Sequence, residues 1–206
     1  MSATRAGAAR AGRVDGAATH RRIVEAALEV LAERGWRNAS VDEVAKRAGA
    51  TRGAVQHHFK DKNGLFAASV QHILDLRIEQ IEALAAIEHT AAEDRTHRIV
   101  QTVVEMHVGP LFAAALQLCV AAANDDTLRN RIAAMELEVG ARGFWALIDL
   151  LELDGSKAKV RTTVQAFLDA ARGLGLAAML NDDSARRRQV TKRWVELIDE
   201  VRSQPD

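Results

Sequence analysis

The sequence predicts an all-α protein of about nine helices, arranged as a three-helix N-terminal domain followed by a larger helical C-terminal domain. Apolar residues recur at helical spacing along nearly the whole chain, which favours amphipathic helices over strands. Only two prolines and 4% aromatic residues occur in 206 residues, whereas Ala, Leu, Arg and Glu are abundant. This length allows a sizeable core, and no run approaches the roughly 18 apolar residues of a membrane span.

The clearest local signal is the segment 40–59, SVDEVAKRAGATRGAVQHHF, which predicts two short helices joined by a tight turn. Ser40 is a good N-cap, and Glu43 three residues later completes a capping box. Gly49 should end the first helix as a left-handed residue just beyond it. Thr51 is then placed to cap the second helix.

One side of the second helix is apolar, and its other side carries only polar or small residues: Arg52, Gly53, Gln56 and His57. The small Ala45, the turn at Gly49 and the apolar Val55 are spaced as in a helix-turn-helix, which reads DNA. A helical hairpin without a DNA role would show the same caps. It would not explain a basic and nearly side-chain-free surface around Arg52 and Gly53.

The flanking residues complete a three-helix domain. A helix from about Thr19 to Gly35 should pack behind the helix pair, and residues 1–18 are expected to form a disordered leader. An alternative for the leader is a basic arm that reaches into the minor groove through Arg5, Arg10 and Arg13. Asp61 should cap a long connecting helix from Lys62 to about Ile87.

The C-terminal part is predicted to contain five more helices, over residues 90–107, 110–123, 128–153, 156–180 and 183–202. Thr90 and Glu93 form a second capping box at the start of the first of these helices. Gly109-Pro110 and Asp154-Gly155-Ser156 mark two of the breaks between them.

Charge is unevenly distributed although the whole chain, with 28 Lys/Arg and 28 Asp/Glu, has no net charge. Residues 1–66 contain 12 Lys/Arg and 7 Asp/Glu, a net of +5, which leaves 16 and 21, a net of −5, for the remainder. A basic end joined to an acidic remainder is typical of a DNA-binding domain attached to a separate effector domain. A chance distribution of charge would also explain an asymmetry of this size.

The segment from about Thr19 to Phe66 resembles the DNA-binding domain of the TetR (tetracycline-repressor-like) family of bacterial transcriptional regulators. The resemblance rests on a continuous series of residues: Ile23, Ala26, Ala27, Leu28, Gly35, Ser40, Val44, Ala45, Ala48, Gly49, Thr51, Arg52, Gly53, His57, His58, Phe59, Lys60, Asp61, Lys62, Leu65 and Phe66. The rest of the chain is similar to the family only in length and helical character. Gln56 departs from the family pattern, which usually has Tyr at this position.

The resemblance implies a domain division into a leader (1–18), a helix-turn-helix DNA-binding domain (19–66) and a helical effector-binding and dimerisation domain (67–206). It implies double-stranded DNA as a partner, with contacts from these residues: Ser40, Thr51, Arg52, Gly53, Gln56, His57 and Lys62. Arg52 is the best candidate for reading a base, since its guanidinium can pair with guanine in the major groove. The expected function is that of a ligand-responsive repressor that binds a palindromic operator as a homodimer.

The C-terminal part shows no catalytic or metal-binding motif, so no enzyme activity, cofactor or metal is expected. By resemblance, its middle helices would enclose a pocket for a small, largely apolar effector, for which the soft and apolar residues are candidates: Met106, His107, Phe112, Leu116, Cys119, Met135, Trp145 and Phe167. Ordinary core packing is the alternative for each of them. A different functional alternative is a DNA-bound adaptor of the same fold that recruits a protein partner and needs no effector.

The last two helices would pair with their copies in a four-helix bundle, as the resemblance implies. The candidate interface residues are the apolar ones on these helices: Phe167, Leu174, Trp194, Leu197, Ile198 and Val201. The N-terminus lacks the apolar core of a signal peptide and Cys119 is the single cysteine, so a cytoplasmic protein is expected.

Overall fold

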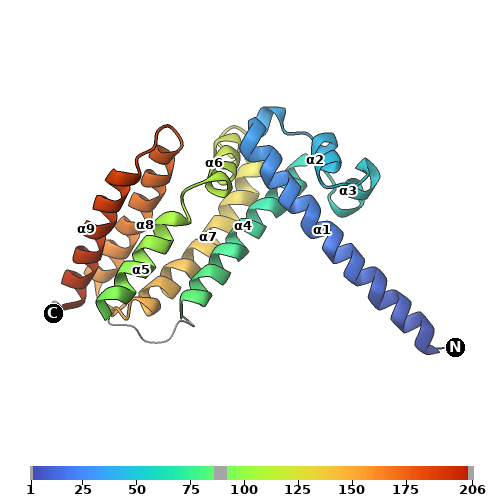
Figure 1. The fold of residues 1–206 in the computed structure, drawn as a ribbon. Coiled ribbons are helices and arrows are strands. Elements are labelled where there is room, and N and C mark those ends of the chain that lie inside the picture. Colours follow the sequence, from blue (N-terminus) through green and yellow to red (C-terminus); the bar gives the residue numbers. More distant parts are fainter. Residues whose placement is uncertain (1, 86–91, 204–206) are drawn as a thin grey trace. The chain divides into compact units, whose positions relative to one another are not determined.

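The computed structural model describes residues 2–85 and 92–203, with the side chains of 2–15, 82, 85, 92–94 and 139 outside the description. Within these residues the chain forms helices and no strand, so the prediction of an all-α fold is confirmed (Figure 1). The helices are α1 Ser2–Asn38, α2 Val41–Arg47, α3 Arg52–His58, α4 Lys62–Ala85, α5 Ala92–Glu105, α6 Pro110–Ala122, α7 Asp126–Leu150, α8 Ala158–Ala178 and α9 Ser184–Ser203.

The first helix is longer than the sequence predicts. α1 begins at Ser2, although its regular geometry is interrupted at Gly35, where φ is 67° and ψ is 167°. This glycine therefore ends the regular part of the helix where the sequence places its end. The disordered leader remains a prediction, and the arm formed by Arg5, Arg10 and Arg13 concerns side chains outside the described residues.

Aspartate side chains bind backbone amides at the starts of α7 and α9 and in the break before α8, although the N-cap residue of α8, Lys157, makes no side-chain capping hydrogen bond. The Asp125 carboxylate accepts a hydrogen bond from the Leu128 amide at 2.9 Å, at the start of α7. Asp154 accepts from both the amide and the hydroxyl of Ser156 in the break before α8. Asp182 similarly accepts from the Ser184 amide at the start of α9. The predicted capping box of Thr90 and Glu93, and the end of α4 near Ile87, lie outside the described residues.

The chain divides into two compact units. The first unit contains residues 1–72 and 114–132, and the second contains residues 73–113 and 133–206. α4, α6 and α7 contribute residues to both units. The N-terminal unit thus recruits α6 and the start of α7 from the part of the sequence beyond residue 66.

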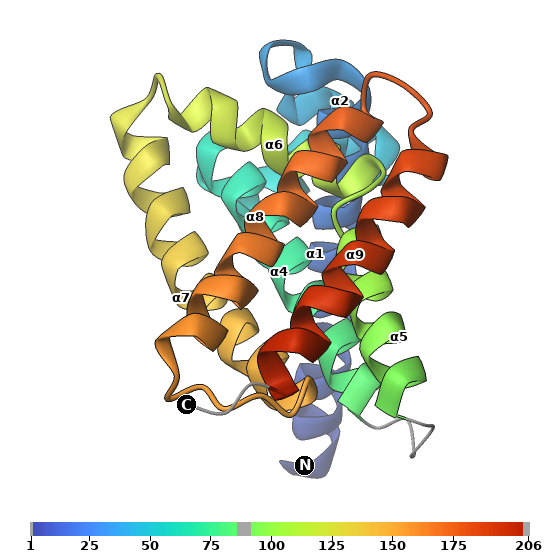
Figure 2. The same cartoon turned by 90° about the vertical axis from the view of Figure 1, so that its left-hand side faces the viewer.

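Each unit has its own apolar core. In the first unit the largest fully buried side chains are Ile23, Leu31, Leu65, Phe66, Leu118 and Leu128. In the second unit α5, α8 and α9 pack side by side, as Figures 1 and 2 both show. The core that these helices share with α7 includes Val100, Val103, Leu147, Val164, Phe167 and Ile198.

α8 approaches the end of α5 so closely that only glycine fits at position 175. A Cβ atom at Gly175 would lie 1.9 Å from the His107 carbonyl oxygen and 2.8 Å from a ring carbon of Phe112. Gly173, two residues earlier on α8, is different, because a Cβ there would have no neighbour within 4 Å.

No single helix in the described residues is long and apolar enough to cross a membrane. One pair of segments, Arg95–Glu105 and Pro110–Ala122, passes that test only when combined, and the two are bent by 54° relative to one another.

Candidate nucleic-acid interface and ligand pocket

The short helices α2 and α3 form the predicted two-helix motif, and local hydrogen bonds fix its ends. The Ser40 hydroxyl accepts from the Glu43 amide at 3.2 Å, and the Thr51 hydroxyl accepts from the Ala54 amide at 3.1 Å. Gly49 has φ 61°, the left-handed conformation that glycine adopts at low cost. Both predicted N-caps and the predicted turn are therefore confirmed.

Ion pairs fix α2 against α1. The Glu43 carboxylate accepts from Arg34 at 3.0 Å, and Arg47 donates to Glu33 at 2.6 Å and lies 3.6 Å from Glu29. The hydrogen bond from Arg47 lowers the pKa of Glu33. The Glu43 side chain thus contacts α1, whereas the predicted capping box would direct it to the backbone at Ser40.

The outer surface of α3 is exposed and almost entirely polar. Arg52, Gly53, Gln56 and His57 are exposed, while Val55 is buried on the opposite side. A Cβ at Gly53 would find only the Thr51 hydroxyl, at 3.9 Å. The packing of this unit therefore does not require glycine at position 53, and the absence of a side chain leaves the α3 backbone open to a close external contact.

The base-reading candidate Arg52 is positioned by a residue that the sequence analysis missed. One nitrogen of its guanidinium, Nη1, donates to both carboxylate oxygens of Asp42 on α2, at 2.9 and 2.7 Å. Both side chains are exposed. The interaction restricts the flexible arginine and engages Nη1. The other two guanidinium nitrogens, Nη2 and Nε, can donate to another acceptor.

Lys62 has a structural contact at the start of α4. Its ammonium group donates to the Trp36 carbonyl oxygen at 2.7 Å and lies 4.3 Å from the centre of the Trp36 ring. Partial burial lowers the pKa of Lys62. The lysine therefore connects the end of α1 to α4. Its contact with a DNA phosphate stays a prediction, and the ammonium group would make that contact with its remaining N–H donors.

The second unit contains a small and mostly apolar pocket of about 70 Å³. Its lining comes from α4, α5 and the turn after it, α7 and α8. The lining residues are Leu74, Arg77, Ile78, Ile81, Val103, Met106, His107, Glu136, Gly140, Gly143, Phe144, Leu147, Leu168 and Arg172. Apolar walls with a few polar groups are typical of small-molecule sites.

His107 is the buried polar group of this pocket. Its side chain is 6% exposed, and Nδ1 lies 2.8 Å from the Val103 carbonyl oxygen. Burial, with help from the positive charges of Arg77 and Arg172, lowers the pKa of His107 to about 4. The ring is therefore neutral at pH 7 and donates from Nδ1 to Val103.

Residues 23–69 match the family model described as "Bacterial regulatory proteins, tetR family". The match spans the second half of α1, both short helices and the start of α4, which carry the geometry described above. This segment of the chain belongs to the TetR family. The resemblance inferred from Ser40, Thr51, Arg52 and Gly53 is thereby confirmed.

Among curated relatives, the HTH-type transcriptional regulator BetI of Escherichia coli is 37% identical over 81 residues. That alignment covers 39% of this chain and 42% of BetI, so the similarity spans less than half of the relative. It supports a TetR-type DNA-binding unit in this chain.

Solved structures resemble the chain over most of its length. A transcriptional regulator from Rhodococcus sp. Rha1 has a TM-score of 0.66 at 23% identity, covering 88% of this chain and 95% of the regulator. FadR from Bacillus subtilis, crystallised with stearoyl-CoA, has a TM-score of 0.65 at 21% identity, covering 86% of this chain and 96% of FadR. Identities this low establish a shared TetR-family fold and nothing about ligands.

The structure brings only two of the predicted ligand residues, Met106 and His107, to the pocket. Phe112 is buried with its ring centre 5.6 Å from that of His107, behind the lining. Half-buried Met135 on α7 is also outside the lining. Apolar character alone cannot distinguish a lining residue from its packing neighbour.

Four other ligand candidates are placed elsewhere, which corrects the sequence-based assignment. Leu116 and Cys119 are on the part of α6 that belongs to the first unit, and Cys119 is exposed. Trp145 is half exposed and contacts Phe144, while Phe167 is fully buried in the core of the second unit. The charged lining residues, by contrast, were missed because charge on a helix usually indicates a solvated face.

The assignment of the dimer interface also needs correction. Phe167 and Ile198 are 0% exposed, and Leu174 and Val201 are buried as well, so these four side chains already fill the core between α5, α8 and α9. The other two candidates, Trp194 and Leu197, are half-buried, with the Trp194 ring against Phe167. The exposed apolar side chains of α8 and the residues that follow it are instead Leu176, Met179 and Leu180.

Proposed function

We propose that this TetR-family chain is a DNA-binding transcriptional regulator, and specifically a ligand-responsive repressor. The observation that carries the proposal is the exposed outer side of α3, where Arg52 is positioned by Asp42 and Gly53 leaves the backbone accessible. A helix presented in this way fits the major groove of duplex DNA. Such a role places the protein in the cytoplasm.

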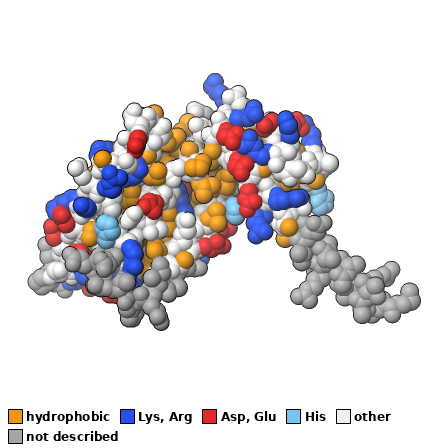
Figure 3. Space-filling view, viewed as in Figure 1, with side chains coloured by type: hydrophobic (Ala, Val, Ile, Leu, Met, Phe, Trp, Pro, Cys, Tyr) orange, Lys and Arg blue, Asp and Glu red, His pale blue; other side chains and the backbone are white. Residues whose placement is uncertain are grey.

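The charges on the N-terminal unit support specific rather than merely electrostatic binding. Figure 3 shows Lys and Arg side chains intermixed with Asp and Glu over α1 to α3 on the face in view. Several of the basic residues are held by acidic partners, including Arg34, Arg47 and Arg52. Phosphate contacts supply affinity, and the few groups on α3 that face outward would supply sequence discrimination.

A homodimer is the proposed active form. Two copies related by a two-fold axis would place their α3 helices about 34–36 Å apart on successive major grooves, and would therefore recognise a palindromic operator. The exposed Leu176, Met179 and Leu180 provide an apolar patch at the end of α8 that a second copy would cover. The buried Phe167, Leu174, Ile198 and Val201 are not accessible to such an interface.

The pocket around His107 is the proposed effector site. Its apolar walls would accept a small, largely apolar molecule, and Arg77, Glu136 and Arg172 would select the polar part of that molecule. FadR, whose fold is similar, was crystallised with stearoyl-CoA. The effector must bind the DNA-incompetent conformation more tightly, by the same coupling energy that it removes from DNA binding.

The proposal is tested by selecting bound sequences from a random duplex library, followed by sedimentation of the purified complex. The expected result is an enriched palindrome bound by two chains. Enrichment of no sequence, or binding of an asymmetric site by one chain, would refute the repressor model. The effector site is then tested by measuring operator affinity in the presence of a series of small molecules. The same measurement on Met106→Trp, in which the larger side chain fills the pocket, is the comparison.

The small size of the pocket favours an alternative function, a DNA-bound adaptor that recruits a protein partner and has no effector. About 70 Å³ is well below the roughly 300 Å³ at which drug-sized ligand sites begin. Operator affinity that no small molecule changes, in wild type and pocket-filled variant alike, would favour the adaptor.

Arg52→Ala should relax base preference at one position of each operator half-site, at a cost of about 1–3 kcal/mol, because the variant cannot pair with a base edge. The measurement is fluorescence anisotropy with the selected operator and with single-base variants of it. Binding of unrelated duplex DNA should change much less. An equal loss on all sequences would show that Arg52 contacts phosphate and not a base.

Asp42→Asn should have two opposite effects on DNA binding. Removal of a negative charge from the DNA-binding surface should strengthen binding to every duplex, while loss of the contact to Arg52 should reduce discrimination at the base pair that Arg52 reads, by about 0.5–1 kcal/mol. The readout is the ratio of affinities for the operator and its single-base variants.

The matched control is Glu29→Gln, which removes a negative charge from the same unit without touching Arg52. It should leave discrimination unchanged. Asp42→Asn should also have no further effect on discrimination in the Arg52→Ala background, since the two residues act as one unit. An additive effect would mean that Asp42 does not act through Arg52.

A further inference from the structure

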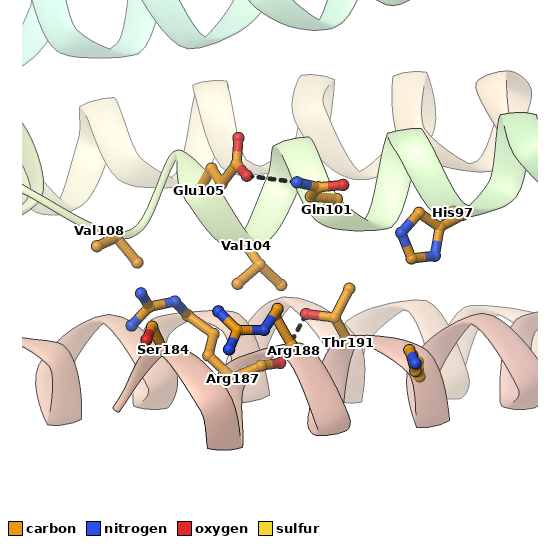
Figure 4. Close-up of a pocket in the computed structure, with 10 residues that line it drawn as sticks. His97, Gln101, Val104, Glu105, Val108, Ser184, Arg187, Arg188 and Thr191 are labelled. Carbon is orange, nitrogen blue, oxygen red and sulfur yellow. Dashed lines mark hydrogen bonds between the residues drawn. The ribbon is translucent and has the colours of Figure 1, made fainter. Parts of the chain in front are cut away.

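The second unit also has a groove between α5 and α9, with a volume of about 320 Å³ (Figure 4). Its lining residues are His97, Gln101, Val104, Glu105, Val108, Ser184, Arg187, Arg188, Thr191 and Lys192. None of them lines the pocket around His107, although α5 contributes to both. The groove is therefore a separate candidate site, and it is large enough for a small organic molecule.

The α9 wall of this groove is basic. Figure 4 shows the Arg187 and Arg188 side chains extending from α9 toward α5, with Val104 and Val108 on the opposite side. Figure 3 also shows Lys and Arg side chains gathered over α9. A run of arginines on a helix usually indicates a solvated face, but here Arg187 and Arg188 line the groove.

Two of these basic residues make no ion pair within 4.0 Å among the described residues, although the charge of Arg188 helps to lower the pKa of the Asp182 carboxyl. Arg186 and Arg187 pair with Asp183, Arg193 pairs with Glu196 and Glu200, and Arg202 pairs with Asp199. Arg188 and Lys192, in contrast, have no ion pair within the part of the chain that the structure describes.

The spacing of Arg188 and Lys192 brings their two positive charges together. Arg188 and Lys192 are four residues apart on α9, so they lie on one side of the helix, where two like charges repel. Both line the groove. An anion between them would neutralise both charges at once.

The opposite wall limits what can bind. The only carboxylate among the lining residues is Glu105, and its Oε1 atom accepts a hydrogen bond from Gln101 at 2.7 Å. Val104 and Val108 give that wall an apolar part. A ligand for this site would therefore direct its charged end toward α9 and an uncharged part toward the valines.

We propose that the α5–α9 groove binds a small, multiply charged oxyanion, such as a phosphorylated or polycarboxylate metabolite. Arg188 and Lys192 bind its charged oxygens, and Arg187 contributes the part of its guanidinium that Asp183 does not use. The proposed site does not depend on DNA binding, so this inference can be correct or wrong independently of the proposed function.

The test is calorimetric titration of the full chain with inorganic pyrophosphate, in low-salt buffer free of divalent metals. Wild type should bind one pyrophosphate per chain. The double variant Arg188→Gln/Lys192→Gln should bind at least tenfold more weakly, whereas Glu105→Gln should bind more tightly. Thermal unfolding of each variant checks that it is folded.

The matched control is Arg193→Gln, which removes a positive charge from the same helix but outside the groove. Its affinity should remain within twofold of wild type. No binding by wild type, or an equal loss in the control, would overturn the proposal and leave only general attraction to a basic surface. Titration with citrate under the same conditions distinguishes phosphate from carboxylate ligands. If duplex DNA occupied the groove and neither small anion did, the proposal would also be overturned.

Discussion

Gly175→Ala is expected to destabilise the second unit by about 3 kcal/mol, because the new methyl group would lie 1.9 Å from the His107 carbonyl oxygen. That neighbour is backbone, so α8 must move away from the end of α5 to make room. The movement would disturb packing around Phe112, whose ring is also within 2.8 Å of the added atom. Chemical denaturation monitored by circular dichroism measures the loss.

Gly173→Ala provides the matched control on the same helix. Position 173 has no neighbour within 4 Å of an added Cβ, so alanine should only remove the flexibility of glycine in a helix. The expected result is a gain of about 0.5–1 kcal/mol. If both variants were stabilised, the close approach of α8 to His107 would not exist in solution.

Acidification should destabilise the protein through His107. Burial lowers the pKa of His107 from 6.5 to about 4 in the folded state. Between these two values the unfolded chain takes up a proton that the folded chain does not, so the stabilising contribution is present above about pH 6.5 and is lost as the pH falls to about 4. The shift corresponds to a loss of about 3 kcal/mol.

Replacement of His107 by Gln should abolish this part of the pH dependence, since the amide has no charge to gain and can still donate to Val103. The measurement is the free energy of unfolding of both proteins at pH 7 and pH 4, because other titrating groups then cancel in the comparison. An unchanged pH dependence in His107→Gln would contradict the burial of a neutral imidazole.

These two predictions concern the same region, where the end of α5 meets α8 beside the proposed effector pocket. The close contact at Gly175 fixes the His107 backbone, and burial of its ring keeps a neutral donor in the pocket wall. A change at either residue should therefore alter both the stability of the second unit and the shape of the proposed effector site.

The sequence alone determined the helical class, the ends of most helices and the DNA-binding motif. Caps and turns depend on residues only a few positions apart, so Ser40, Gly49, Thr51 and Asp61 could be assigned from local chemistry, and the structure places each as expected. The exposed side of α3 followed from helical periodicity in the same way.

Only the tertiary structure decided which residues meet across helices. The contact of Asp42 with Arg52 joins positions on two helices, and nothing in the local pattern indicates it. Phe167, Leu174, Ile198 and Val201 illustrate the same limit, since an apolar side chain on an amphipathic helix is equally suited to a core, a pocket or an interface. Periodicity tells which side of a helix avoids water, but the partner that covers this side depends on how helices distant in sequence pack together.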